Sequence, residues 1–329
     1  MEVLQGPSAS ARLDGPSVST VGVFDGVHLG HRAVLGEAVR AAHDGGLAAV
    51  AVTFDRHPLE VVDPPRRPPL ITSLDRKAEL IASVGLDILV VLRFDDELAS
   101  WPAERFAQRI LRDDLRAARV VVGENFTFGR RALGTVATLE ELGPSLGFAA
   151  EGVPLVVLDS RRVSSTSIRE AVTVGELSWP RRALGRPFTV DGSVVAGAGR
   201  GAGLGFPTAN LEVPAGMLLP GRGVYAGRAH VDGGQTHPAA INVGTNPTFG
   251  GEPLHVEAFL LDFEGDLRGR TVVVEFVERL RDEERFDSVP ALVEQIRADV
   301  ERTRWIIGAA DGDPSPGEST AAGPEDPGR

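Results

Sequence analysis

Short apolar runs rich in valine alternate with amphipathic segments along the first half of this chain. The runs have the length of buried strands, and the segments between them repeat their apolar residues at helical spacing. Four strand–helix repeats predict right-handed crossovers and a parallel, doubly wound α/β sheet. The expected strands span 18–24, 47–54, 88–94, 119–122 and 153–158, and the expected helices span 33–42, 74–83, 103–115 and 136–142.

Three loop segments each follow directly after one of these strands. They cover residues 22–31, 53–58 and 123–129. Ligands of open parallel sheets bind at the carboxyl ends of the strands. We therefore expect a ligand site where these three loops meet.

The second half changes character near Gly185. Short, valine-rich segments follow one another closely there and are bounded by Gly, Pro or Asp, which predicts a small antiparallel β-barrel. One helix is expected to close it, because Leu292, Ile296 and Val300 share a stripe. The expected strands span 188–195, 223–231, 237–243, 255–262 and 271–277, and the helix spans 289–304.

The length of 329 residues suits two domains. We predict an α/β domain over 17–184 and a barrel domain over 185–305. Residues 306–329 are expected to be a disordered tail, because they are rich in Gly, Pro, Asp and Ser and have little to bury. Residues 1–16 stay outside the fold prediction, since residues 2–7 resemble the remnant of a protease-cleavage site.

Composition excludes several classes of function. The net charge of −12 argues against nucleic acid as the main partner, since binding to its backbone relies on Lys and Arg. The absence of cysteine excludes disulfides, thiolate zinc sites and cysteine nucleophiles. No apolar run approaches the ~20 residues of a membrane span, and the N-terminus lacks a signal-like core. We expect a cytoplasmic protein with neither nucleic acid nor membrane as partner.

The first candidate site is the segment 22–31, which reads GVFDGVHLGH. A strand-to-helix turn there would aim backbone N–H groups at an anion. Gly30 lets the backbone bend between His28 and His31, whose imidazoles can donate hydrogen bonds to phosphate oxygens. The alternative is two surface histidines on a turn.

Two further segments add polar groups to this half. Ser164, Thr166 and Arg169 offer hydroxyls and a guanidinium near an expected helix N-terminus. The alternative for them is a plain serine N-cap with an exposed arginine. Asn125 follows a strand directly, which puts it at the carboxyl edge of the sheet unless it is only a turn asparagine.

The second candidate site begins in a glycine-rich loop. Residues 197–202 fit the dinucleotide pattern G-x-G-x-x-A, but the glycines and proline that follow argue against the helix this pattern requires. The loop can still wrap phosphates with its backbone N–H groups, through Gly199, Gly201 and Gly205. Thr208 and Asn210 project to one face and can ligate Mg²⁺. The alternatives are a flexible hairpin loop and an asparagine–threonine turn.

The first half resembles the adenylyltransferase half of the prokaryotic bifunctional riboflavin kinase/FAD synthetases, a Rossmann-like domain of the H-x-G-H nucleotidylyltransferase superfamily. Residues 22–31, 53–58, 123–129 and 164–169 carry the resemblance, with Arg56 in place of a proline. It implies that His28 and His31 act on the phosphates of ATP. It also implies a nucleotide pocket that includes Gly22, Phe24, Asp25, Gly30, Asn125, Ser164, Thr166 and Arg169.

The second half resembles the riboflavin kinases. The G-x-P-T-A-N signature at 205–210 carries this resemblance together with residues 223–225, 242–249, 256–258, 262–269 and 281–287. It implies that Glu257 is the general base for the ribityl hydroxyl. A lone strand carboxylate otherwise faces solvent. The resemblance also places Asn242, Thr245 and Arg285 beside the flavin, although Arg285 can equally be an exposed charge.

Together the resemblances imply two consecutive reactions. Riboflavin is phosphorylated to FMN, and FMN is adenylylated to FAD with release of pyrophosphate, each step using ATP and Mg²⁺. One alternative is a riboflavin kinase whose first domain binds nucleotide without making FAD. Another is a flavin carrier without turnover. The sequence leaves the oligomeric state open, a homo-oligomer included.

Overall fold

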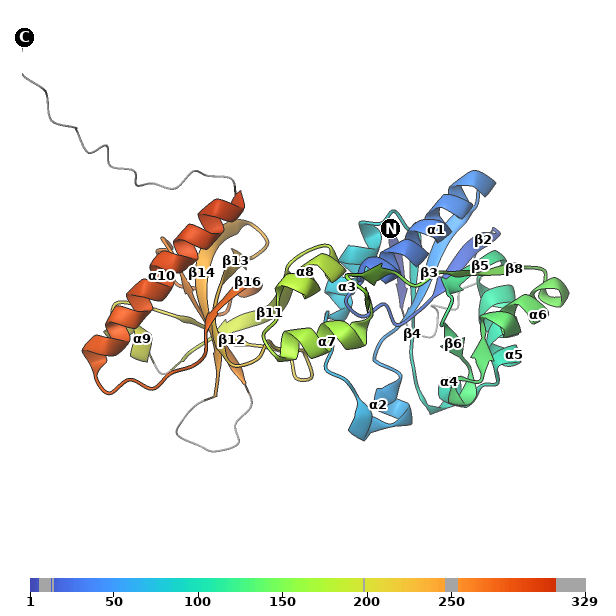
Figure 1. Cartoon of the computed structure of the whole chain (residues 1–329). Helices are drawn as coiled ribbons and strands as arrows, with labels where there is room; N and C mark the ends of the chain where they lie inside the picture. Colours follow the sequence, from blue (N-terminus) through green and yellow to red (C-terminus); the bar gives the residue numbers. More distant parts are fainter. Residues whose placement is uncertain (6–12, 14, 198, 246–253, 312–329) are drawn as a thin grey trace, which may run out of the picture. The chain divides into compact units, whose positions relative to one another are not determined.

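A computed structural model describes residues 1–5, 13, 15–197, 199–245 and 254–311. The chain forms two compact units (Figure 1). The first comprises Met1–Gly192 and Val213–Gly221, and the second comprises Ser193–Glu212 and the chain from Arg222 onward. Residues 246–249, part of the expected flavin segment, and residues 312–329 of the expected tail lie outside the described residues.

The first unit is built on a six-stranded sheet in which every pair is parallel. From one edge to the other the order is β1 (Glu2–Gln5), β4 (Ile88–Leu92), β3 (Ala48–Phe54), β2 (Ser17–Val21), β5 (Ala117–Gly123) and β8 (Ala149–Val153). The chain proceeds from β2 to β3 on one side and places β5 on the other. The sheet therefore has its topological switch point at β2, where such folds bind ligands.

Helices cover both faces of this sheet, which confirms the doubly wound prediction. On one face α1 (Leu29–Gly45) and α3 (Leu74–Ala82) share a core with Ala51 and Val91. On the other, α5 (Ala103–Phe106), a π-helical continuation (Ala107–Asp114) and α6 (Val136–Leu146) share a core with Val50 and Val122. The remaining elements are α2 (Leu59–Val62), α4 (Asp96–Ser100), α7 (Ser165–Thr173), α8 (Ser178–Leu184), β6 (Thr127–Phe128), β7 (Gly134–Thr135), β9 (Val157–Leu158), β10 (Arg161–Arg162) and two 3₁₀ helices (Pro64–Arg66 and Arg130–Ala132).

Two expectations for this unit were wrong at the edges of the sheet. The run 153–158 is not the last parallel strand, because β8 ends at Val153 and β9 pairs antiparallel with β10. β8 is an edge strand that is only partly buried, so its sequence lacks an apolar run. Residues 2–5, left outside the fold prediction, form β1 against β4.

The second unit is a closed barrel of six strands, which confirms the predicted antiparallel barrel. The barrel order is β11 (Phe188–Val195), β12 (Ala209–Glu212), β15 (His255–Leu260), β14 (Gln235–Gly244), β13 (Gly223–Val231) and β16 (Thr271–Arg281). The structure adds β12 to the five expected strands. Two strands, β11 and β13, begin and end at the predicted residues. A single helical turn, α9 (Arg200–Gly203), lies in the glycine-rich loop before β12, where no helix was expected.

The closing helix α10 (Val289–Asp311) is longer than predicted. It continues past Arg304, so residues 306–311, expected in the tail, are helical. The cause is tertiary, because Ile306 and Ile307 are buried against Ala226 of the barrel.

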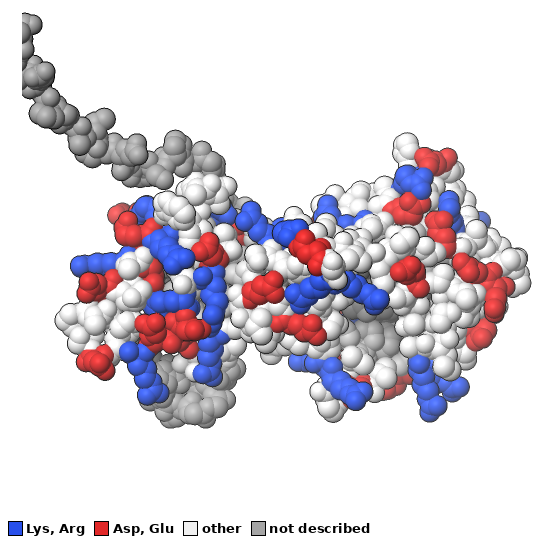
Figure 2. All heavy atoms as spheres, in the orientation of Figure 1, with Lys and Arg blue, Asp and Glu red and all other residues white. Residues whose placement is uncertain are grey.

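Among the described residues, no helix is both long enough and apolar enough to span a bilayer. On the face shown in Figure 2, acidic and basic side chains are interspersed.

Candidate active sites

The loop after β2 folds into a tight turn that carries the first site. Phe24, Gly26 and Val27 all have positive φ angles, of 50°, 84° and 40°. Such angles are costly for residues with a Cβ and persist only where surrounding contacts hold them. A Cβ on Gly22 would come within 2.8 Å of the Phe24 ring, so this glycine makes room for the turn.

The two histidines stand at the start of α1. His28 is the N-cap residue, and its Nδ1 accepts a hydrogen bond of 3.2 Å from the backbone N–H of His31. The rings stack with centroids 3.6 Å apart. Gly30 permits this packing, since a Cβ there would lie 3.1 Å from the His28 ring. Because Nδ1 is an acceptor, the neutral ring of His28 carries its proton on Nε2 and can donate from that atom.

Burial keeps both imidazoles neutral. It lowers the pKa of His28 to about 4, helped by the positive charges of Arg169 and Arg186. The pKa of His31 lies well below its ordinary value, first through burial and then through His28 and Lys77. Nδ1 of His31 is buried and has no hydrogen-bond partner among the residues that the structure describes. At a buried polar atom of this kind, a bound ligand or a water molecule can supply the missing hydrogen bond.

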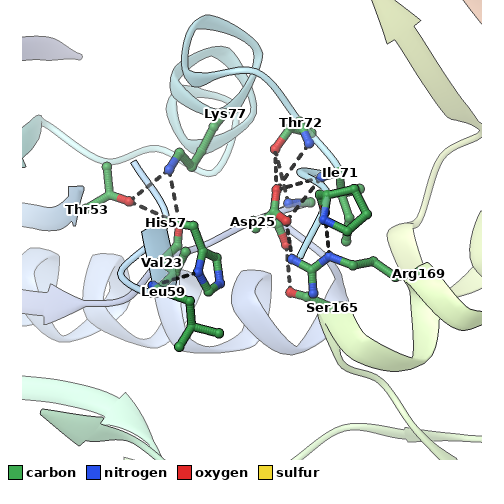
Figure 3. A network of polar contacts seen from close by, with 12 residues as sticks. Val23, Asp25, Thr53, His57, Leu59, Ile71, Thr72, Lys77, Ser165 and Arg169 are labelled. Atoms are coloured by element: carbon green, nitrogen blue, oxygen red, sulfur yellow. Dashed lines mark hydrogen bonds and ion pairs between the residues drawn. The ribbon is translucent and has the colours of Figure 1, made fainter. Parts of the chain in front are cut away.

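Asp25, in the turn after β2, forms a buried ion pair with Arg169 of α7 (Figure 3). The Asp25 carboxylate also accepts hydrogen bonds from the backbone N–H groups of Ile71, at 3.0 Å, and Thr72, at 3.1 Å. Arg169 Nε donates to the carbonyl of Pro69 at 2.7 Å. Both side chains, expected in the nucleotide pocket, therefore join α7 and the segment 69–72 to the turn after β2. The carboxylate of Asp25 is satisfied by the protein and is 4% exposed.

The other residues expected in this pocket either take part in a helix cap or are exposed to solvent. Ser164 is the N-cap of α7 in a capping box with Ser167, so its hydroxyl takes part in the helix cap. The reading of Arg169 as exposed is wrong, because its side chain is only 12% exposed. Thr166 and Asn125 are exposed, the latter in the turn directly after β5.

The sequence analysis missed Lys77 of α3. This side chain is buried, and its Nζ donates to the carbonyl of Val23 at 3.1 Å and to Oγ1 of Thr53 at 3.2 Å. A signal was available in the sequence. Of the 34 Lys and Arg residues, Lys77 is the only lysine.

The second site lies on three neighbouring barrel strands. Glu257 of β15 is the register partner of Asn210 on β12 and of Asn242 on β14. Thr208 Oγ1 donates to Glu257 Oε2 at 3.3 Å, and His255 Nε2 lies 3.5 Å from Oε1. A Cβ on Gly197 would overlap the Asn210 amide, so the glycine-rich loop passes directly over it. The strand register thus brings together three of the expected groups.

A cavity of about 350 Å³ opens beside this row. Gly199, Gly201, Thr208, Asn210, Asn242, Thr245 and Glu257 all line it, together with Phe206, Phe259, Leu292 and Ile296. Gly205 does not line the cavity; its φ of +86° lies in the turn before Thr208. Apolar walls with a few converging polar groups are typical of a small-molecule site.

The loop between β16 and α10 forms one wall of this cavity. Glu283, Glu284 and Phe286 are lining residues. Arg285 is exposed and is not among them, so the alternative of an exposed charge agrees better with its position. The sequence analysis missed Arg281, which also lines the cavity and pairs with Asp299 of α10 at 2.7 Å.

The described residues contain no cluster of three or more His, Asp or Glu side chains that could hold a metal ion by themselves. A magnesium ion bound here would need oxygens from a ligand. The Thr208 hydroxyl and the Asn210 carboxamide fit that arrangement, because Mg²⁺ with nucleotides is held by few protein groups plus phosphates and water.

Comparisons with known proteins cover both units. Residues 10–167 match the family model for FAD synthetase, and residues 184–307 match that for riboflavin kinase. A bifunctional riboflavin kinase/FMN adenylyltransferase from Pseudomonas fluorescens is 38% identical over 290 residues, 88% of this chain and 92% of that protein. The protein of the same description from Escherichia coli K12 is 34% identical over 291 residues, 88% of this chain and 93% of that protein.

A solved structure from Streptococcus pneumoniae, described as a macrolide-efflux protein, superposes with a TM-score of 0.84. It is 31% identical, and the match covers 92% of this chain and 99% of that one. The same two-unit fold therefore occurs along the whole of a second chain. On the family models and the curated relatives, this chain belongs to the bifunctional riboflavin kinase/FMN adenylyltransferase family.

Proposed function

We propose that the two units divide two consecutive reactions, with riboflavin phosphorylated in the barrel and FMN adenylylated in the α/β unit. The observation that carries the proposal is that each unit holds its own polar site. One is the neutral pair His28 and His31 at a helix N-terminus, and the other is Glu257 in a cavity bordered by a glycine-rich loop. Riboflavin, FMN and ATP are the partners, and the cytoplasm, where ATP is supplied, is the compartment.

In the barrel, Glu257 takes the proton from the ribityl hydroxyl as that oxygen attacks the γ-phosphorus of ATP, the bond from this phosphorus to the β–γ bridging oxygen breaks, and ADP leaves. Asn242 and Thr245 orient the flavin in the cavity, whose apolar walls suit the isoalloxazine ring. Thr208 and Asn210 hold Mg²⁺, which when bound neutralises phosphate charge. The backbone of Gly199 and Gly201 faces the phosphates.

In the α/β unit, the phosphate of FMN attacks the α-phosphorus of ATP and pyrophosphate leaves. No covalent intermediate with the protein is needed, so positioning and charge neutralisation supply the catalysis. His28 and His31 donate hydrogen bonds to phosphate oxygens as neutral imidazoles. Asn125 and Thr166 border the nucleotide from the turn after β5 and from α7, while Asp25 and Arg169 fix the turn that presents the histidines.

One time course tests the proposal. The full chain is incubated with riboflavin, ATP and Mg²⁺, and riboflavin, FMN, FAD, ADP and pyrophosphate are followed together. We expect FMN with ADP first, and then FAD with pyrophosphate. FMN that accumulates without FAD would favour a kinase whose first unit only binds nucleotide, and no product at all would favour a flavin carrier.

A further inference from the structure

We propose that Lys77 is a positioning residue for adenylyl transfer, which holds the turn after β2 in the shape that orients His31. This inference rests on the proposed assignment of that reaction to the first unit. Figure 3 shows the Lys77 ammonium directed at Val23 and Thr53, across from the Asp25–Arg169 pair.

The contacts of Lys77 join the ends of two neighbouring strands. Nζ donates to the Val23 carbonyl in the turn after β2, and to Thr53 Oγ1 and the Phe54 carbonyl at the end of β3, at 3.1, 3.2 and 3.5 Å. Thr53 Oγ1 itself donates to the Val23 carbonyl at 3.1 Å. This carbonyl is therefore held by two donors at once.

The Val23 carbonyl belongs to the peptide that enters Phe24, whose φ is +50°. A non-glycine residue holds such an angle only where its surroundings fix it. The Phe24 ring in turn meets the His31 ring edge to face, with centroids 5.4 Å apart. A chain of direct contacts thus runs from Lys77 through Val23 and Phe24 to His31.

The presence of lysine rather than arginine at position 77 supports a specific role for this side chain. The chain uses arginine for 33 of its 34 basic residues and lysine only here (34 − 1 = 33). An ammonium is compact and can direct three hydrogen bonds to converging acceptors, whereas a guanidinium is planar and larger. Lys77 is 7% exposed, so its ammonium makes these bonds away from solvent.

The surrounding charges affect the protonation of this ammonium. Burial lowers the pKa of Lys77 to about 8, while Asp25 and Asp55 act to raise it. The positive charge of Lys77 in turn contributes to lowering the pKa of His31 and the pKa of His57. The charge of Arg169 lowers both pKa values as well. Loss of the Lys77 proton above about pH 8 would weaken the bonds that hold the turn, and would remove a positive charge from a site for phosphates.

The test combines kinetics with a lysine-specific signal. We expect Lys77→Met to lower kcat for FMN adenylylation by about 100-fold, the size expected when a catalytic group is misplaced by about 1 Å. KM for ATP should change less than kcat. Riboflavin phosphorylation by the other unit should stay within about twofold, which shows that the loss is confined to the first unit. Arg76→Met, one residue earlier on α3, is the matched control and should leave both reactions unchanged.

Because Lys77 is the only lysine, protein labelled with [ε-¹³C]lysine gives one resonance whose titration measures its pKa directly. We expect the resonance to titrate near pH 8. In the unmodified chain, kcat/KM for adenylylation should fall as the pH rises, with the same midpoint. Unchanged kcat in Lys77→Met would overturn the inference. Failure of the unmodified chain to make FAD would instead overturn the proposed function, and the NMR titration would still report the state of Lys77.

Discussion

Asn210 lies directly opposite Glu257, because β12 and β15 pair antiparallel at these two residues. The pairing sets a carboxamide beside a carboxylate at the wall of the cavity, and Thr208 Oγ1 reaches the same carboxylate at 3.3 Å. A proposed metal ligand and a proposed general base are thus adjacent through strand register alone. The close placement makes the two roles separable only by experiment.

Substitution Glu257→Gln tests the general base. The amide keeps the shape of the side chain but cannot accept a proton, so kcat for FMN formation should fall by about 10²- to 10⁴-fold. Riboflavin binding, measured by quenching of flavin fluorescence, should persist. FMN adenylylation serves as the control and should be unaffected. An unchanged kcat would remove Glu257 from the mechanism.

Substitution His31→Ala tests the first site. Loss of a donor aimed at phosphate oxygens should lower kcat for FAD formation by about 10²- to 10³-fold. FMN formation should continue at the normal rate, because it belongs to the barrel. His43→Ala, at an exposed position in the last turn of the same helix, is the matched control. Equal losses of both products in His31→Ala would contradict two independent sites.

The buried pair Arg281 and Asp299 tests the wall of the cavity. Arg281 donates to both carboxylate oxygens of Asp299 and to the carbonyl of Asp282, and so holds the loop after β16 against α10. Asp299→Asn should reduce the stability of the barrel by about 3–5 kcal/mol and raise KM for riboflavin. The exposed pair Arg302 and Glu278 gives the control, and Arg302→Ala should change stability by less than about 1 kcal/mol.

Denaturant unfolding of the Asp299→Asn and Arg302→Ala variants, read alongside riboflavin kinetics, decides this point. If the two substitutions cost the same free energy of unfolding, the buried pair does not act as a tie between β16 and α10.

The pH dependence of stability tests the burial of His28. Its pKa is lowered from 6.5 to about 4 in the folded chain. Between these two pH values His28 is protonated in the unfolded chain but neutral in the folded one. The free energy of unfolding therefore rises with pH across this window and decreases as the pH falls. At 1.4 kcal/mol per pH unit the effect is roughly 3 kcal/mol. Urea unfolding at pH 5 and 7.5 should show a smaller difference for His28→Asn, and an equal one would mean that His28 is protonated when folded.

Elements with a strong internal pattern were predictable from the sequence. β11 and β13 begin and end at the predicted residues; buried and less buried positions alternate along β11, whereas β13 is buried along most of its length. β8 was misplaced, because an edge strand that is only partly buried carries no apolar run. α7 was anticipated only through Ser164 as an N-cap. Its capping box is a local signal, whereas the buried state of Arg169 is not.

Local sequence by itself determined the strand-to-helix turn that carries His28, Gly30 and His31, and the spacing of Thr208 and Asn210, because capping and strand alternation act between neighbouring residues. Only the tertiary structure decided that Asp25 meets Arg169, 144 residues away, and that Lys77 reaches Val23, 54 residues away. Val23 and Asp25 follow the carboxyl end of β2, and the packing of α3 and α7 against this edge of the sheet brings Lys77 and Arg169 to them. Burial at that edge then sets the protonation of the groups gathered there, which no local pattern records.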